Sequence, residues 1–300
     1  MPLIPITSLD DPRVAPYRNL KDRDLAREGG RFLAEGHLVV HRLLASSFET
    51  ESVFLADTRV ADNLPLIPAH VPVYVAPPQL VSAVMGFKFH AGVMAVGLRG
   101  PSPTIDGVMR SKDEGGRMKD EQSAIRNPQS EIGSPSSFIL PPSSLVTWLI
   151  APDIEKSDNL GAVVRIAAGF GCAGVLLGER SCDPFSRQAV RVSMGSALAL
   201  PIVRSDDLKR DLAILKERHD VQLAATVLAD DAEPLEPATR PARVGLLLGN
   251  EFHGLAEDVV ALCDRRVTLP MSLGTDSLNV AVAAGVFLYH FTRIARVTNP

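Results

Sequence analysis

The stretch that decides the fold is "LVTWLIAPDIEKSDNLGAVVRIAAGFG", residues 145–171. It opens with seven residues that are apolar apart from one threonine, a run typical of a strand buried on both faces. After a polar turn comes an apolar segment long enough for a helix, and Gly169 and Gly171 mark its end. The stretch therefore predicts a strand followed by a helix, the unit from which parallel sheets are built.

The same alternation of strand and helix continues to the C-terminus. We expect further strands at residues 173–178, 201–204, 221–228, 243–251 and 265–271. We expect further helices at residues 185–200, at 205–219 with Ser205 as the N-cap, at 256–264, and from about Leu278 onward. Residues 146–300 are thus predicted to form an α/β domain whose parallel sheet carries helices on both faces.

The chain before this domain has a different character. Residues 1–98 hold short apolar strands such as "SVFLAD" beside helical patterns such as "RFLAEGHLVVHRLLAS", which predicts a small separate α/β domain. Residues 99–145 are rich in Pro, Ser, Gly and charged residues, and few apolar side chains are available to anchor them. We expect residues 99–145 to form a flexible linker or insertion.

The composition narrows the class of protein. No run of about 18 uncharged apolar residues is present, and the N-terminus lacks the features of a secretory signal, so no membrane span is expected. Cys172, Cys182 and Cys263 are not spaced as a disulfide framework or a zinc site, which favours a reducing cytoplasm and no metal. The net charge of −4 excludes a globally basic nucleic-acid binder. Six basic residues between Arg13 and Arg31 still form either a solvated helix face or a local basic patch.

Three polar segments follow predicted strands, at the edge where open parallel sheets bind ligands. In the first, Arg165 interrupts an apolar helix that Asn159 can cap, and a buried guanidinium needs a partner. In the second, "LLLGNEFHGL", glycines permit close backbone approach, and Glu251 is the expected partner of Arg165. The two residues form either a structural ion pair or part of a binding site.

The third segment is "GTDSLNVAVAAGVFLYH", residues 274–290, in which small polar residues precede a long apolar helix. Ser277 or Asp276 can cap that helix, and Asn279 then lies in its first turn. Asparagine is disfavoured inside a helix unless its side chain bonds something specific. The segment is therefore either a simple cap or the edge of a binding site.

In this order, Asn159 with Arg165, then Gly249-Asn250-Glu251, then Ser277-Leu278-Asn279 resemble the three motifs of the SpoU (TrmH-like) branch of the SPOUT RNA methyltransferases. "PFSRQAVRVSMGSALALPI" is similar to the family's segment between the first two motifs. "RFLAEGHLVV" is similar to the start of the small N-terminal domain, related to ribosomal protein L30e, that many members carry. Two departures are Lys156-Ser157-Asp158, where an Asp-Pro-Gly type turn is frequent, and Ala281, where serine is common.

The resemblance implies a fold, a cofactor and a reaction. Family members transfer a methyl group from S-adenosylmethionine to a ribose 2′-hydroxyl of ribosomal or transfer RNA. Their catalytic domain contains a deep trefoil knot, and they are homodimers with the site near the subunit interface. The cofactor is expected to bind the second and third motifs, at Leu248, Gly249, Asn250, Glu251, Leu269, Met271, Ser277, Leu278 and Asn279.

The resemblance also implies roles for individual side chains. Arg165 is expected to stabilise the developing alkoxide or, with a depressed pKa, to accept its proton. Asn159 would hold Arg165 or the ribose, Glu251 would orient Arg165, and Asn279 with Ser277 would position the target or the cofactor. The expected RNA phosphate contacts are Arg18, Lys21, Arg23, Arg31, Arg180, Arg187 and Arg191. The rival interpretations are a catalytically silent RNA-binding protein of this fold and a doubly wound enzyme that uses another nucleotide.

Overall fold

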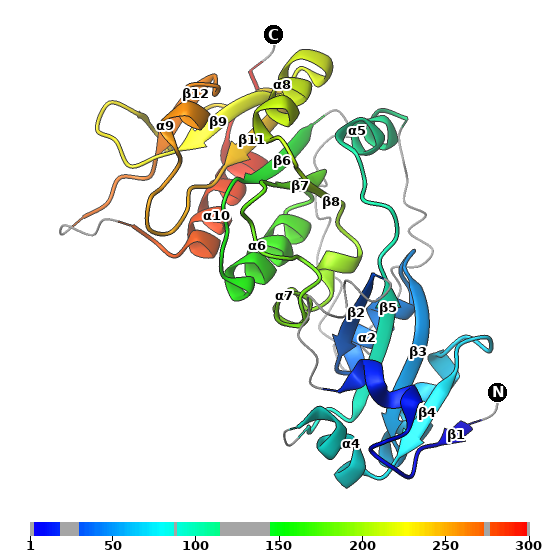
Figure 1. The fold of residues 1–300 in the computed structure, drawn as a ribbon. Coiled ribbons are helices and arrows are strands. Elements are labelled where there is room, and N and C mark those ends of the chain that lie inside the picture. The colour runs from blue at the N-terminus through cyan, green and yellow to red at the C-terminus, as the bar shows by residue number, and fades with distance from the viewer. Residues whose placement is uncertain (1–2, 19–29, 87–88, 115–144, 273–276, 299–300) are drawn as a thin grey trace, which may run out of the picture.

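The computed structural model describes residues 3–18, 30–86, 89–114, 145–272 and 277–298, which form two sheets with helices packed on them (Figure 1). Of the predicted site residues, Lys21 and Arg23 lie outside the described residues, as does the candidate cap Asp276. Within the described ranges, no helix is long and apolar enough to span a membrane.

The N-terminal part contains a five-stranded mixed sheet in the order β1-β4-β3-β5-β2. Its strands are β1 (Leu3–Pro5), β2 (Arg31–Glu35), β3 (Glu49–Ala56), β4 (Val73–Ala76) and β5 (Val93–Leu98). Its helices are η1 (Pro12–Tyr17), α2 (His37–Leu44), η2 (Asp57–Arg59), α3 (Val60–Asn63), η3 (Leu64–Leu66) and α4 (Pro78–Met85). The predicted α/β character of this part is present, whereas its likeness to ribosomal protein L30e stays a prediction.

Only the second half of one helix predicted in this part is helical in the structure. The apolar stripe assigned to residues 31–46 is shared between strand β2 and helix α2, which Gly36 separates at a φ of 86°. Phe32 and Ala34 pack into one hydrophobic cluster and Leu33 into another, because successive side chains of a strand point to opposite faces. Residues 31–35 form a strand rather than a helix because they pair with β5 along their whole length.

The C-terminal part contains a seven-stranded sheet in the order β10-β12-β9-β11-β6-β7-β8, and every pairing in it is parallel. The strands are β6 (Val146–Ala151), β7 (Gly174–Leu177), β8 (Ile202–Arg204), β9 (Gln222–Thr226), β10 (Glu233–Pro234), β11 (Arg243–Leu247) and β12 (Arg265–Thr268). The helices are α6 (Ser157–Gly169), α7 (Arg187–Val192), η5 (Ser196–Leu198), α8 (Leu208–His219), α9 (Glu257–Val260), α10 (Val280–Tyr289) and η6 (His290–Ile294).

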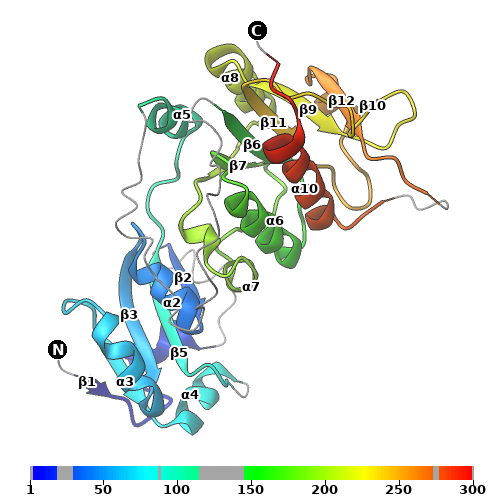
Figure 2. The same ribbon diagram turned by 180° about the vertical axis from the view of Figure 1, so that it is seen from behind.

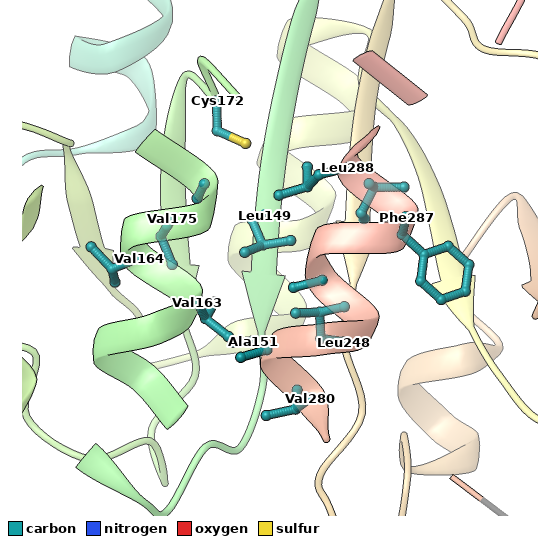
Figure 3. Packing of buried hydrophobic residues seen from close by; sticks show 14 of the residues in the cluster. Leu149, Ala151, Val163, Val164, Cys172, Val175, Leu248, Val280, Phe287 and Leu288 are labelled. Atoms are coloured by element: carbon teal, nitrogen blue, oxygen red, sulfur yellow. The ribbon is translucent and has the colours of Figure 1, made fainter. Parts of the chain in front are cut away.

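Alternate residues of the central strand β6 are buried against opposite layers of helices. Leu149 and Ala151 pack against α6 and α10, which lie side by side on one face of the sheet (Figures 2 and 3). Trp148 and Ile150 pack into the cluster that contains α8 and α9 on the other face. The predicted parallel sheet with helices on both faces is therefore confirmed, and the trefoil knot stays a prediction.

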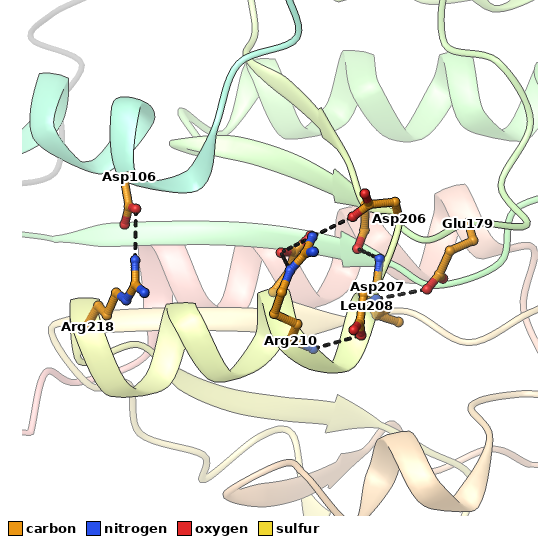
Figure 4. A network of polar contacts seen from close by, with 9 residues as sticks. Asp106, Glu179, Asp206, Asp207, Leu208, Arg210 and Arg218 are labelled. Carbon is orange, nitrogen blue, oxygen red and sulfur yellow. Dashed lines mark hydrogen bonds and ion pairs between the residues drawn. The ribbon is translucent and has the colours of Figure 1, made fainter.

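The linker expected over residues 99–145 contains an ordered helix, α5 (Ile105–Asp113). Thr104 caps this helix, and its apolar stripe of Ile105, Val108 and Met109 packs into the cluster beneath the C-terminal sheet. Asp106 also forms an ion pair with Arg218 of α8 at 3.2 Å (Figure 4). The expectation of an unanchored segment is thus wrong for α5, because three apolar residues at helical spacing suffice to dock one helix.

Three predicted helix boundaries also differ from the structure. The helix expected over 185–200 is split into α7 and η5, because Met194 and Gly195 adopt left-handed backbone angles. Helix α8 is capped by Asp207 rather than Ser205, and Asp207 accepts a hydrogen bond from the backbone N–H of Arg210 (Figure 4). Helix α10 is capped by Asn279 rather than by Ser277.

The two parts of the chain share an interface that contains both apolar and ionic contacts. Phe185, which precedes α7, packs against the rings of Phe32 and Phe48 at centroid distances of 5.3 Å. The guanidinium of Arg99 donates two hydrogen bonds to the carboxylate of Asp183, at 3.1 and 2.6 Å. Such bidentate pairs fix orientation as well as distance, so the N-terminal sheet is held against α7 in a defined position.

Helices α6 and α7 pack most closely at Gly161, which yields the first prediction. A Cβ at Gly161 would lie 2.7 Å from the backbone oxygen of Ala189, so Gly161→Ala is expected to lower the free energy of unfolding by about 1–3 kcal/mol. Gly169 of the same helix has open space, so Gly169→Ala is expected to be neutral or stabilising by about 0.5–1 kcal/mol. Urea unfolding of both variants measures the difference, and equal stability would contradict the close packing.

Candidate active site

The polar loops of interest lie where the strand order of the sheet reverses. From β6 the chain builds outward through β7 and β8, then returns to the other side with β9, so that β11 lies beside β6. The loop after β6 and the turn after β11 are therefore neighbours at the carboxyl edge of the sheet. This reversal point is the usual ligand site of open α/β sheets.

The turn after β11 is organised by Asn250. Its backbone exchanges hydrogen bonds with Gly254 at 2.8 and 3.0 Å, and its side-chain oxygen accepts from the backbone N–H of Phe252 at 2.8 Å. A Cβ at Gly249 would lie 2.7 Å from the carbonyl carbon of Gly254, so this position requires glycine. The hydrogen bonds of Asn250 thus close the turn and hold Glu251 and Phe252 in fixed positions.

Glu251 is the centre of a polar network that joins all three motifs. Its carboxylate accepts a hydrogen bond from Lys156 Nζ at 2.7 Å and another from the Asn159 side-chain amide. Asn279 donates from Nδ2 to Asn159 Oδ1 at 3.1 Å, while its own Oδ1 caps α10 through the backbone N–H of Ala281 at 2.9 Å. Asn279 therefore serves as a helix cap and as a member of the network at once.

Arg165 is placed differently from the prediction. It is exposed on α6, and within the described part of the chain no hydrogen bond or ion pair joins it to Glu251, to Asn159 or to any other side chain. Asn159 and Arg165 are six residues apart, which separates them by about 9 Å along the helix and about 240° around it. Glu251 consequently pairs with Lys156, a residue that was not among the predicted site residues.

A large cavity adjoins the network. It has a volume of about 1020 Å³ and is bounded by the segments that follow β9, β11 and β12 and by the start of α10. Of the nine expected cofactor contacts, all but Asn279 line it: Leu248, Gly249, Asn250, Glu251, Leu269, Met271, Ser277 and Leu278. The sequence pattern did not identify the wall formed by residues 226–229, because that stretch reads only as the end of a strand.

The arginines expected to contact RNA fall into different environments. Arg187 forms an ion pair with Glu35 of β2 at the interface between the two parts, and its side chain is only 18% exposed. Arg31 pairs with Glu51, Arg18 with Asp10, and Arg180 with Asp153. Arg191 is exposed and donates to Gln188. The guanidinium of Arg187 neutralises a buried carboxylate in the free protein, and the RNA contacts of these arginines stay predictions.

The site offers neither a reactive thiol nor a cluster of metal ligands among the described residues. Burial raises the pKa of the Cys182 thiol, although a hydrogen bond with Ser157 acts in the opposite direction. This thiol is therefore neutral at physiological pH and is a poor nucleophile. Within the ranges that the structure describes, no three His, Cys, Asp or Glu side chains are arranged to hold a metal ion.

The contrast between Arg187 and Arg191 on helix α7 gives the second prediction. Arg187→Ala leaves the Glu35 carboxylate buried without its cation, so the free energy of unfolding is expected to fall by about 3–5 kcal/mol. Arg191→Ala removes an exposed side chain four residues away and is expected to change stability by less than about 0.5 kcal/mol. Chemical denaturation distinguishes them, and equal losses would argue against a buried ion pair.

Known proteins share the motifs and the fold. The model of the SpoU rRNA methylase family matches residues 147–289. An uncharacterized tRNA/rRNA methyltransferase of Mycobacterium bovis is 35% identical over 300 residues, covering 97% of this chain and 92% of that protein. The 23S rRNA (guanosine-2′-O-)-methyltransferase RlmB of Acinetobacter baylyi is 34% identical over 146 residues, covering 48% of this chain and 59% of that protein.

A solved structure has the same architecture over nearly the whole chain. The AdoMet-bound rRNA methyltransferase from Sinorhizobium meliloti has a TM-score of 0.72 at 24% identity, covering 96% of this chain and 97% of that one. This likeness establishes the fold, and the relative that matches almost end to end at 35% identity establishes the kinship. The chain therefore belongs to the SpoU rRNA methylase family.

Proposed function

We propose that this RNA methyltransferase of the SpoU family transfers a methyl group to a ribose 2′-hydroxyl of structured ribosomal or transfer RNA. The observation that carries the proposal is the network of Glu251, Asn159, Asn279 and Lys156 beside the large cavity. A related protein named as a guanosine-2′-O-methyltransferase of 23S rRNA supports the ribose as the acceptor.

The cofactor of the reaction is S-adenosylmethionine, and the cavity suits it. A volume of about 1020 Å³ lies at the upper end of the range for small-molecule sites. Apolar side chains such as Leu269, Met271 and Leu278 line the cavity beside the close-packed backbone at Gly249. When bound, the cofactor supplies a methyl group on a positively charged sulfur, which is already a strong electrophile.

The protein's own contribution is to orient the hydroxyl and stabilise its developing charge. A ribose hydroxyl is a weak nucleophile and must be held in line with the carbon it attacks. An amide NH₂ group has two N–H donors. Asn159 donates one of these N–H groups to Glu251, and we assign the other N–H group to a hydrogen bond with the ribose. As the hydroxyl gives up its proton to solvent water, Arg165 would stabilise the negative charge that develops on the oxygen.

We infer that Arg165 acts on the ribose bound by a second copy of the chain in a homodimer, because in its own chain it lies on a different face of α6 from Asn159. Helix α10 and the following η6 expose large apolar side chains, Val282, Tyr289 and Ile294, and α10 packs beside α6, which carries Arg165. A second copy seated on these helices would bury the apolar side chains and cover Arg165. This arrangement accounts for a guanidinium that is exposed in one chain while the carboxylate of Glu251 is already paired with Lys156.

The function is tested by incubation of the protein with labelled S-adenosylmethionine and RNA. The substrates are ribosomal RNA, transfer RNA and assembled ribosomal subunits from cells that lack this gene. A methylated ribose resists alkaline cleavage, so we expect label and protection at the same nucleotide. Transfer to none of these substrates would leave the catalytically silent RNA-binding protein as the better interpretation, and a labelled base without protection would exclude the ribose.

The role of Arg165 provides the third prediction. Arg165→Ala is expected to lower kcat by about 10²–10³-fold while the Kd for S-adenosylmethionine stays unchanged, since the charge it stabilises exists only in the transition state. Arg110→Ala, which removes an exposed arginine of α5, is the control and should keep full activity. Titration calorimetry and single-turnover assays give the two quantities. An Arg165→Ala protein that unfolds would point to a structural role instead.

A further inference from the structure

The turn that carries Glu251 also holds an apolar side chain out into solvent. Phe252 is 71% exposed, the highest value among the exposed large hydrophobic residues of the described ranges. Its backbone N–H is tied to Asn250 Oδ1 at 2.8 Å, and the turn is closed between Asn250 and Gly254. The phenyl ring is thus displayed by a hydrogen-bonded turn, and the hydrophobic effect alone would favour its burial.

Phe252 borders the site on two sides. It lines the large cavity, and it also lines the small hollow between the turn and the loop after β6. Its neighbour in sequence, Glu251, is the centre of the polar network. An acceptor bound at the network therefore lies close to the phenyl ring.

A cation accompanies the ring. Lys156 Nζ lies 5.1 Å from the centroid of Phe252 and 2.7 Å from Glu251 Oε2, and the lysine side chain is 57% exposed. An ammonium group has three N–H donors, so the bond to Glu251 leaves donors that can face solvent. Phe252 and Lys156 together present an aromatic surface and a positive charge side by side.

Unpaired RNA offers the matching pair of groups. Its bases stack on aromatic side chains, and its phosphates are bound by lysine and arginine. We propose that Phe252 and Lys156 form a substrate clamp, in which an unpaired base of the RNA stacks on the phenyl ring and the adjoining phosphate binds Lys156. The inference rests on the proposed function, since it assigns the RNA contacts nearest to the reacting ribose.

The clamp accounts for the ion pair between Lys156 and Glu251. In the free protein, Glu251 neutralises the ammonium group while that group lies over the ring. An arriving phosphate competes for the same cation, and the Asn159 amide then remains as the partner of the Glu251 carboxylate. Lys156 is thereby a positioning residue as well as a phosphate contact.

The first test is photochemical and does not depend on catalysis. The full-length protein is irradiated at short ultraviolet wavelength with ribosomal or transfer RNA, digested, and mapped by mass spectrometry. We expect a nucleotide adduct on Phe252, within the tryptic peptide 244–265, because stacked rings cross-link efficiently. Adducts found only on other peptides would overturn the clamp, as would failure of the protein to bind either RNA.

The second test separates stacking from simple apolar contact. Phe252→Ala and Phe252→Leu are both expected to raise the Kd for RNA about 10-fold, whereas Phe252→Tyr and Phe252→Trp keep it near the original value. The Kd for S-adenosylmethionine and the thermal midpoint serve as controls for folding. If leucine substitutes as well as tyrosine, or if the alanine variant changes the oligomeric state, the ring belongs to a protein interface and the clamp is wrong.

The third test uses salt to isolate the phosphate contact. Lys156→Ala is expected to reduce the slope of log Kd against log salt by about one unit, and the Phe252 variants should leave that slope unchanged. Lys209 is a matched control, because it is 59% exposed and pairs with Asp258 at 2.7 Å. An unchanged slope for Lys156→Ala, or an equal change for Lys209→Ala, would refute the phosphate contact.

These outcomes distinguish the clamp from the proposed function. Methylation by Phe252→Ala with an unaltered KM for RNA would leave the methyltransferase intact and remove the clamp. Cross-linking at Phe252 without methyl transfer by the unaltered protein would support the clamp and contradict the proposed methyltransferase activity.

Discussion

The structure depends on one constraint, the burial of the C-terminal parallel sheet on both faces. Leu149 and Ala151 pack against α6 and α10, while Trp148 and Ile150 pack against the opposite layer, so strand β6 has no surface left for solvent. Polar groups that must meet water or a ligand are therefore confined to the ends of the strands. The reversal of strand order between β6 and β11 decides which two ends lie together, and the motifs follow those strands.

At that point one carboxylate organises residues far apart in the sequence. Glu251 bonds Lys156 and Asn159 from the loop and helix after β6, and Asn159 in turn receives a bond from Asn279 at the start of α10. Asn279 can serve there only because it is the cap of α10, with its side chain at the helix end. The helix cap and the member of the polar network are thus the same residue in the fold.

Arginine roles depend on the packing of neighbouring elements rather than on the arginine itself. On α7, Arg187 faces β2 and neutralises the buried Glu35, whereas Arg191 of the same helix is exposed. The aromatic contacts of Phe185 and the pair formed by Arg99 and Asp183 lie at the same interface. This interface fixes the N-terminal sheet against the C-terminal part, so any RNA surface on that sheet would have a defined direction toward the site.

The sequence by itself determined the local features: the apolar strands, the helices between them, the three polar segments, and their resemblance to one family. Those features follow from side-chain periodicity and from turn and capping chemistry, which act over a few residues. The tertiary structure alone decided the long-range pairings. Only packing sets the rotation of a helix about its axis and the position of a loop relative to it. For this reason Glu251 forms its ion pair with Lys156 instead of Arg165, and Arg187 forms an ion pair with a buried carboxylate instead of facing solvent. The docking of α5 and the exposure of Phe252 beside the cavity depend on the same placement of elements, which no local pattern encodes.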